Sequence, residues 1–308
     1  RRSNRNMVQT VQAIINGQTY NLNYNELSGK WETTITAPSK SSYTQDDHYY
    51  PVTVKATDDA GNVTEKDDTD SILGKSLKLK VVEKNPPQIS VTYPTNGAYI
   101  GSATPQIQWT VTDDDSGVNP DTISLTIDSN GAITEGIQKT PNEGGYNCTY
   151  TPSTLGDGVH VINFNAQDYD GNSAQVQTVS FTIDTVPPVL TITNPDNNLV
   201  TNQAQCVVSG TTNDVTSSPV TVTIKLNNGE AEQVTVQENG EFTKTVTLTE
   251  GVNTIVVTAT DSSGKSSEVS RTVTLNTSAP VITEVSIVPN PVDAGQTFII
   301  SVTVTDED

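Results

Sequence analysis

A hairpin phrase that recurs three times constrains the fold of this 308-residue chain more than any other feature. Each copy is an apolar segment of alternating pattern that ends at an Ala-x-Asp step, then a glycine turn, then a returning segment. Prolines follow every copy, at Pro86-Pro87, Pro187-Pro188 and Pro280. The copies begin at Val52, Val159 and Ile255. Three copies of one hairpin and one linker predict three copies of one domain.

Short alternating segments with turn residues between them predict strands throughout. Asn16-Gly17 is a two-residue hairpin signal, because both residues tolerate positive φ. Residues 52–57 place Val52, Val54 and Ala56 on one face, as a half-buried strand requires. Strands spaced about 8 to 12 residues apart are typical of β-sandwiches. The sequence therefore predicts an all-β chain of tandem antiparallel sandwiches joined by short proline linkers.

The linkers divide the chain into four parts. We expect a first domain over residues 1–84, a second over 88–185 and a third over 189–278. Residues 281–308 are predicted to form a partial fourth element or a C-terminal strand pair, because a sandwich needs roughly seven strands. Proline restricts the residue before it to extended backbone, which favours semi-rigid junctions.

The repeated pattern resembles the immunoglobulin-like (Big-type) domains found in tandem in bacterial and phage proteins. Its first copy carries Val52, Val54, Ala56, Asp58 and Gly61-Asn62. The second matches at every place, and the third departs only where lysine replaces the final asparagine. This resemblance implies Ig-like sandwiches, and a fold of this kind does not by itself specify a function.

A narrower resemblance concerns residues 29–54 and 288–305, which are similar to Ig-bearing tail proteins of tailed phages and prophages. It implies a structural protein of a phage or phage-tail-like particle, near the tail tip or baseplate, that contributes to assembly or host-surface attachment. The expected partners are other virion or tail subunits, or a bacterial surface glycan or protein, within a larger assembly. The expected location is the virion. The alternatives are a secreted cell-surface adhesin, located outside the cell, and the accessory array of a polysaccharide-active enzyme.

Charge and hydropathy exclude several classes of partner. The formal net charge is −20, from 36 acidic and 16 basic residues, and such a surface repels nucleic-acid phosphates. No segment has the apolar length that membrane insertion requires. The two cysteines, Cys148 and Cys206, fall in different predicted domains and are expected to be buried as small apolar residues.

Catalytic patterns are not found in the sequence. Its two histidines lie in different predicted domains, without a nucleophile motif beside either. Phosphate-binding loops, CxxC pairs and HExxH are also missing from the sequence. We expect no enzymatic activity and no organic cofactor.

Calcium is the one ligand that the sequence indicates, because closely spaced carboxylate and amide oxygens suit this ion. Two stretches qualify, the acidic loop 113–121 and the turn 168–172. Alternatively, these side chains only cap their own turns. The candidate ligands are Asp113, Asp115, Asn119, Asp121, Asp168 and Asp170.

Three tyrosines crowd the long polar segment of the first domain beside His48. Aromatic side chains in a polar loop can stack on a sugar or contact a protein partner. The alternative is that they pack against their own sheet. The candidates for partner or glycan contact are Tyr43, Tyr49 and Tyr50.

Overall fold

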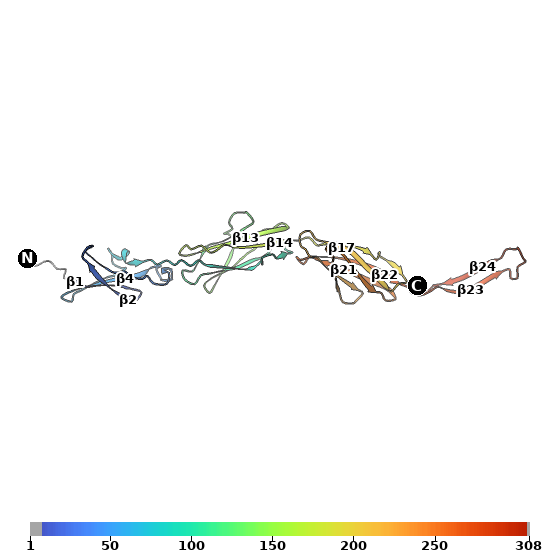
Figure 1. The fold of residues 1–308 in the computed structure, drawn as a ribbon, viewed down its shortest axis with the longest axis horizontal. Helices are drawn as coiled ribbons and strands as arrows, with labels where there is room; N and C mark the ends of the chain where they lie inside the picture. The colour runs from blue at the N-terminus through green and yellow to red at the C-terminus, as the bar shows by residue number, and fades with distance from the viewer. Residues whose placement is uncertain (1–7, 307–308) are drawn as a thin grey trace, which may run out of the picture. The chain divides into compact units, whose positions relative to one another are not determined.

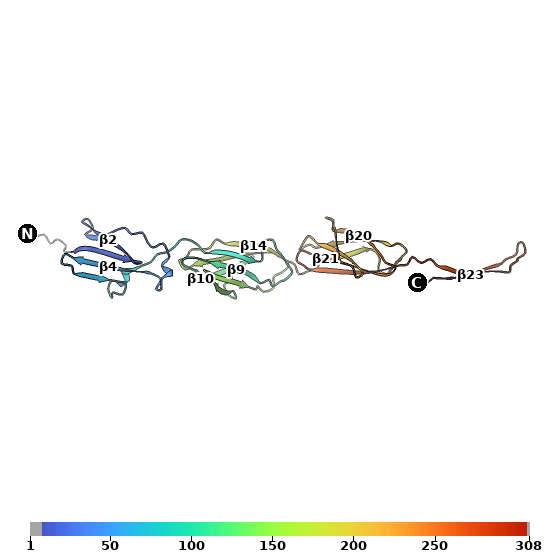
Figure 2. The ribbon, with the colours of Figure 1, turned by 90° about the horizontal axis from the view of Figure 1, so that it is seen from below.

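The computed structural model describes residues 8–306 and is built almost entirely of antiparallel strands, which confirms the predicted all-β class (Figures 1 and 2). Within the described residues, no helix is long and apolar enough to cross a membrane. The chain separates into two compact units. The first takes in the described part of Arg1–Ala98, together with Thr104–Thr154 and Val159–Phe181, and the second takes in Tyr99–Ala103, Leu155–Gly158 and Thr182–Asp308 as far as it is described.

The strands of the first predicted domain pair as one sheet, in the order β3-β2-β1-β4-β5, with β6 paired to β4. Val11, Ala13 and Ile15 of β1 are buried, and β1 pairs with both β2 and β4. The turn between β1 and β2 has positive φ at Asn16 and Gly17, as the sequence predicts. The alternating pattern of residues 30–36 predicts a longer third strand than Lys30–Glu32, which the structure has. The strands are β1 Val8–Ile15, β2 Gln18–Asn25, β3 Lys30–Glu32, β4 Tyr50–Asp58, β5 Val63–Lys66 and β6 Lys78–Leu79.

The second predicted domain has two four-stranded sheets, ordered β10-β13-β14-β8 and β11-β12-β9-β7. Trp109 on β9 and Phe164 on β13 are both buried, and their ring centroids lie 5.1 Å apart, so the two sheets meet face to face. The strands are β7 Gln88–Tyr93, β8 Tyr99–Ile100, β9 Ile107–Thr112, β10 Val118–Ile127, β11 Gln138–Asn142, β12 Gly145–Tyr150, β13 Gly158–Asp168 and β14 Gln177–Ile183.

The third predicted domain is also a two-layer sandwich, with sheets ordered β15-β17-β20 and β16-β22-β21-β18-β19 (Figures 1 and 2). Its buried core joins Phe242 of β20 to Ile255, Val257 and Ala259 of β21. The strands are β15 Val189–Asn194, β16 Leu199–Thr201, β17 Gln205–Asn213, β18 Thr221–Leu226, β19 Glu232–Val234, β20 Glu241–Thr247, β21 Gly251–Thr260 and β22 Ser266–Leu275.

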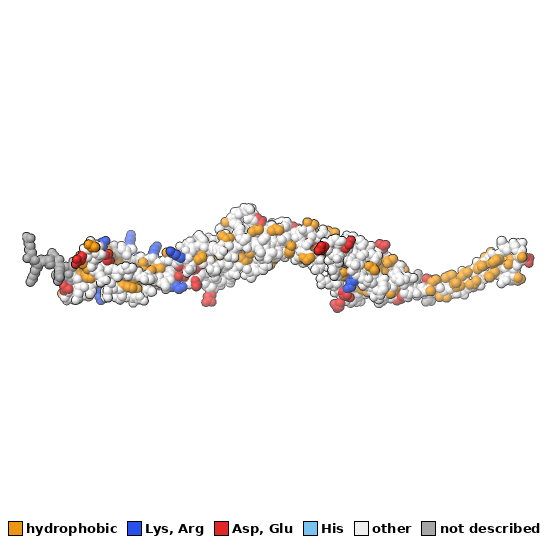
Figure 3. All heavy atoms as spheres, viewed as in Figure 1, with side chains coloured by type: hydrophobic (Ala, Val, Ile, Leu, Met, Phe, Trp, Pro, Cys, Tyr) orange, Lys and Arg blue, Asp and Glu red, His pale blue; other side chains and the backbone are white. Residues whose placement is uncertain are grey.

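The last described strands, β23 Val281–Val288 and β24 Ile299–Thr305, form an antiparallel pair by themselves. In this ribbon Val285 lies opposite Val302, and Ile287 lies opposite Ile300. All four side chains are exposed, and Figure 3 shows hydrophobic side chains gathered along the ribbon. The ribbon therefore has an apolar face that no other described strand covers.

Candidate functional site

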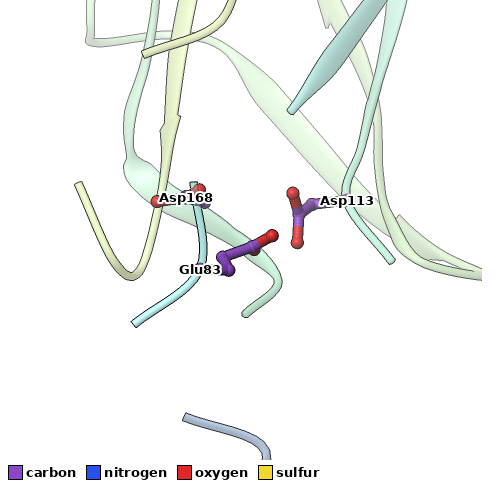
Figure 4. Close-up of side chains that lie close together, drawn as sticks. All are labelled: Glu83, Asp113 and Asp168. Carbon is purple, nitrogen blue, oxygen red and sulfur yellow. The ribbon is translucent and has the colours of Figure 1, made fainter. Parts of the chain in front are cut away.

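Three acidic side chains from distant parts of the first unit converge on one point (Figure 4). Glu83 follows β6, Asp113 comes directly after β9, and Asp168 is the last residue of β13. One carboxylate oxygen from each lies within 4.8 Å of the others. Asp168 is 2% exposed and Asp113 9% exposed, so both carboxylates are largely withdrawn from water.

Local turns hold the two aspartates in place. The Oδ1 atom of Asp113 accepts backbone hydrogen bonds from Asp115 (3.0 Å) and Gly117 (2.8 Å). Asp168 accepts one bond from the Asn172 backbone (2.8 Å) and one from its side-chain amide (2.7 Å). Turn capping therefore takes place at both aspartates, as the alternative interpretation expects. Since both turns are preformed, the carboxylates are positioned without a ligand.

Glu83 is held by the same two loops. Its backbone amide donates to Asp170 (2.9 Å), and its carbonyl accepts from the Asn172 side chain (3.2 Å). Its Oε1 atom accepts from the Ser116 backbone (2.9 Å). The Oε2 atom is buried and has no hydrogen-bond partner among the described residues, and the same holds for the hydroxyl of Ser116. An oxygen without a donor is costly to bury, so these atoms indicate a ligand between the loops.

The charges of the cluster point to a cation. Two unit charges 4.8 Å apart repel by about 3.5 kcal/mol at an effective dielectric constant of about 20. None of the ion pairs formed between described residues includes Glu83, Asp113 or Asp168. Calcium binds oxygen at about 2.3 to 2.6 Å, so two of its ligands lie at most about 5 Å apart. The three carboxylates fit that geometry and leave further coordination positions for water or carbonyl groups.

The six calcium candidates from the sequence have different surroundings in the structure. Asp113 and Asp168 belong to the cluster, and Asp170 binds the backbone of Glu83 instead. Asp115 accepts a hydrogen bond from the Ser41 backbone (2.9 Å), which joins the acidic loop to the first predicted domain. Asn119 and Asp121 lie on β10, where the Asn119 side chain accepts from the Asp121 backbone (3.1 Å), and neither joins the cluster.

Glu83 itself is missing from the sequence-based candidates. A signal for it is present, because an acidic residue stands three places before the double proline in both of the first two linkers. Those residues are Glu83 and Asp184.

The tyrosine candidates pack against their own surroundings. Tyr50 is 3% exposed and donates to the Lys40 carbonyl (3.1 Å), so the expectation that it contacts a partner is wrong. Tyr50 begins β4 and faces inward there. Tyr49 is half-buried and donates to Asp68 (2.7 Å). Tyr43 stacks on Tyr169 with ring centroids 4.3 Å apart.

Both cysteines are free and buried, as expected from the sequence. Burial raises the pKa of the Cys148 thiol to about 11, with Lys139 acting in the opposite direction. Burial also raises the pKa of the Cys206 thiol. Neither thiol is therefore poised as a nucleophile at neutral pH.

Comparison with known proteins identifies the domain type. Residues 96–185 match the family model described as "Bacterial Ig-like domain", and residues 188–277 match "Glucodextranase, domain B". No curated protein matches the chain. Among solved structures, domains A168–A170 of titin align at 15% identity over 85% of this chain and 86% of that chain, with a TM-score of 0.43. The fibronectin(III)-like modules of Clostridium thermocellum CbhA align at 15% identity over 61% of this chain and 94% of that chain, with a TM-score of 0.40. Residues 96–185 are therefore similar to a bacterial Ig-like domain, and the second and third predicted domains are antiparallel β-sandwiches.

Proposed function

We propose that this chain is a non-enzymatic structural and interaction protein, an Ig-like component of a phage or phage-tail-like particle that contributes to assembly or host-surface attachment. The observation that carries the proposal is the ribbon of β23 and β24, whose apolar face is exposed. A two-stranded ribbon is marginally stable alone and gains stability from packing on another sheet. The partner is a β-sheet of a neighbouring subunit, which this face would complete as a sandwich. The resemblance of residues 29–54 and 288–305 to tail proteins supports the same assignment.

The assembly state of the native protein, purified from its source, tests this proposal. The expected result is a chain held in a large particle together with other subunits. A chain that is free or attached to a cell wall would overturn the proposal and favour a surface adhesin.

A matched pair of variants tests the role of the ribbon. Ile287→Thr with Ile300→Thr removes apolar surface from facing positions while keeping β-branched residues, which suit strands. This double variant should lose incorporation into the particle. Ser286→Thr with Ser301→Thr changes the neighbouring facing pair, whose side chains point to the other side of the ribbon, and should assemble normally. Equal assembly of the two double variants would contradict the proposed packing.

The accessory array of a polysaccharide-active enzyme is a second candidate function. The match of residues 188–277 to glucodextranase domain B favours it. Affinity electrophoresis of the chain in gels containing soluble α- or β-glucans tests it. Retardation by a glucan would support the accessory array, and unchanged mobility in every gel would count against it.

We further propose that Glu83, Asp113 and Asp168 bind a calcium ion. The ion would join the linker residue Glu83 to the loops that begin at Asp113 and Asp168, and so strengthen the link that their hydrogen bonds already make. Isothermal titration of the full chain with calcium should lose one binding event in Asp113→Asn. Asp114→Asn is the control, because Asp114 is the exposed next residue and is not in the cluster. Full calcium binding by Asp113→Asn would contradict the assignment.

A further inference from the structure

A second acidic cluster lies in the other compact unit. Asp184 follows β14, Asp214 follows β17, and Asp261 follows β21. One carboxylate oxygen from each lies within 4.8 Å of the others. Asp184 and Asp261 are both buried, with Asp261 6% exposed.

The second cluster repeats the plan of the first. In both, the first acid stands three residues before a double proline, and the second directly follows a strand. A serine comes three residues after that second acid, at Ser116 and Ser217. The third acid ends or follows the strand that opens the repeated hairpin. Asp58 occupies this third position in the first predicted domain, yet it joins no such cluster among the described residues. The clusters thus occur where a linker acid meets the domain that follows it.

One oxygen of the second cluster indicates a ligand independently of the charges. The Oδ1 atom of Asp261 accepts bonds from the Ser263 backbone (2.8 Å), the Ser263 hydroxyl (2.8 Å) and the Lys265 backbone (2.9 Å). Its Oδ2 atom is buried and has no hydrogen-bond partner among the described residues. Burying a carboxylate oxygen without a donor or a cation is unfavourable. The turn accounts for one oxygen of this side chain and leaves the other for a ligand.

The groups around the cluster provide only partial compensation. Ser217 donates its hydroxyl to Asp184, and the Val186 backbone also donates to Asp184 (3.1 Å). Asp214 accepts from the Ser217 backbone (2.8 Å). Lys265 is the cationic residue of the turn, yet no ion pair between described residues joins it to these carboxylates. Three anionic groups therefore remain together without a cationic side chain bound to them.

We propose that Asp184, Asp214 and Asp261 form a second calcium site. Calcium fits better than magnesium, because magnesium demands nearly octahedral geometry, gives up its water reluctantly and is seldom held by protein carboxylates alone, whereas calcium accepts several carboxylates in a flexible geometry. The bound ion connects Asp184, which stands just before Pro187-Pro188, to the loops at Asp214 and Asp261. Calcium thereby makes this junction firmer, whether or not the chain belongs to a particle.

Calorimetric titration of the full chain, stripped of metal and then supplied with calcium chloride, tests the second site. We expect two calcium ions per chain in the parent and one in Asp261→Asn, a variant that keeps the Oδ1 contacts of the turn. Asp214→Asn should also bind one, and agreement between the two variants guards against a local folding defect. Asp58→Asn alters the equivalent turn of the first predicted domain and should still bind two.

Some outcomes would overturn the second site. The second site is disproved if Asp261→Asn and Asp214→Asn each still bind two calcium ions per chain. It is also disproved if Asp113→Asn alone abolishes all calcium binding by the chain. Magnesium binding at this site as tight as calcium binding would refute the choice of ion. If Asp113→Asn and Asp261→Asn each lose one of the two calcium ions, the two sites bind independently. A negative result for one variant therefore does not count against the site that the other variant tests.

Discussion

Replacement of Asp113 by asparagine should change stability in opposite directions with and without calcium. In the metal-free chain, the substitution removes two of the three pairwise repulsions in the cluster, each about 3.5 kcal/mol at 4.8 Å and an effective dielectric constant of about 20. Water and dissolved ions screen part of this, so we expect a gain of about 1 to 3 kcal/mol in the free energy of unfolding. The asparagine Oδ1 can still accept both turn hydrogen bonds.

Calcium should reverse the order of the two proteins. A ligand at about 1,000 times its dissociation constant stabilises the folded parent by about 4.1 kcal/mol, which exceeds the advantage of about 1 to 3 kcal/mol that the variant has without calcium. The variant, which lacks one ligand, should gain far less from the ion at this site. The Asp113→Asn variant therefore has the larger free energy of unfolding in chelator, and the parent has the larger one in calcium.

Urea unfolding followed by tryptophan fluorescence measures both effects. The fluorescence of Trp109 reports on the second predicted domain, because Trp109 is buried in its core on β9, the strand that precedes Asp113. The second tryptophan, Trp31, is removed in a Trp31→Phe background so that one domain gives the signal. Asp114→Asn is the control and should stay within about 0.5 kcal/mol of the parent in both solutions. A variant destabilised equally in chelator and in calcium would refute the electrostatic reasoning.

Three further predictions follow from single residues. Gly145→Ala should destabilise the second predicted domain by about 2 to 4 kcal/mol in urea unfolding, because the new Cβ would overlap the Val111 carbonyl. A change in the free energy of unfolding of less than about 0.5 kcal/mol would contradict this prediction. Cys148, with its pKa raised to about 11 by burial, should react with a thiol reagent only after unfolding, and fast labelling of the native protein would disprove its burial. A hydrogen bond from Lys66 is the largest cause that lowers the pKa of Asp70 to about 2. The stabilisation it gives is present above about pH 4 and is lost as pH falls towards 2, and an NMR titration of Lys66→Met should show the Asp70 pKa shifted back towards 3.8.

Local chemistry made most of the fold predictable from the sequence. Alternation with a period of two marks strands, and Asn16-Gly17 marks a hairpin, because each signal depends only on neighbouring residues. Asp113 and Asp168 could be selected as candidate ligands for the same reason, since each stands at a strand end beside its own turn.

Sheet membership was harder to predict, because it depends on which strands hydrogen bond across long stretches of sequence. The first predicted domain pairs its strands into one sheet, although its hairpin phrase matches those of the two sandwiches. The phrase specifies one hairpin, whereas the number of layers depends on how every other strand of the domain pairs.

The sequence alone therefore determined the all-β class, the repeated hairpins and two of the three acids of the first cluster. The tertiary structure decided that Glu83 joins Asp113 and Asp168, which lie 30 and 85 residues further along the chain. It also decided that Tyr50 is buried and that Asp261 keeps one oxygen without a donor. Burial and the meeting of distant carboxylates arise from the packing of whole sheets and linkers, and no local pattern of residues encodes them.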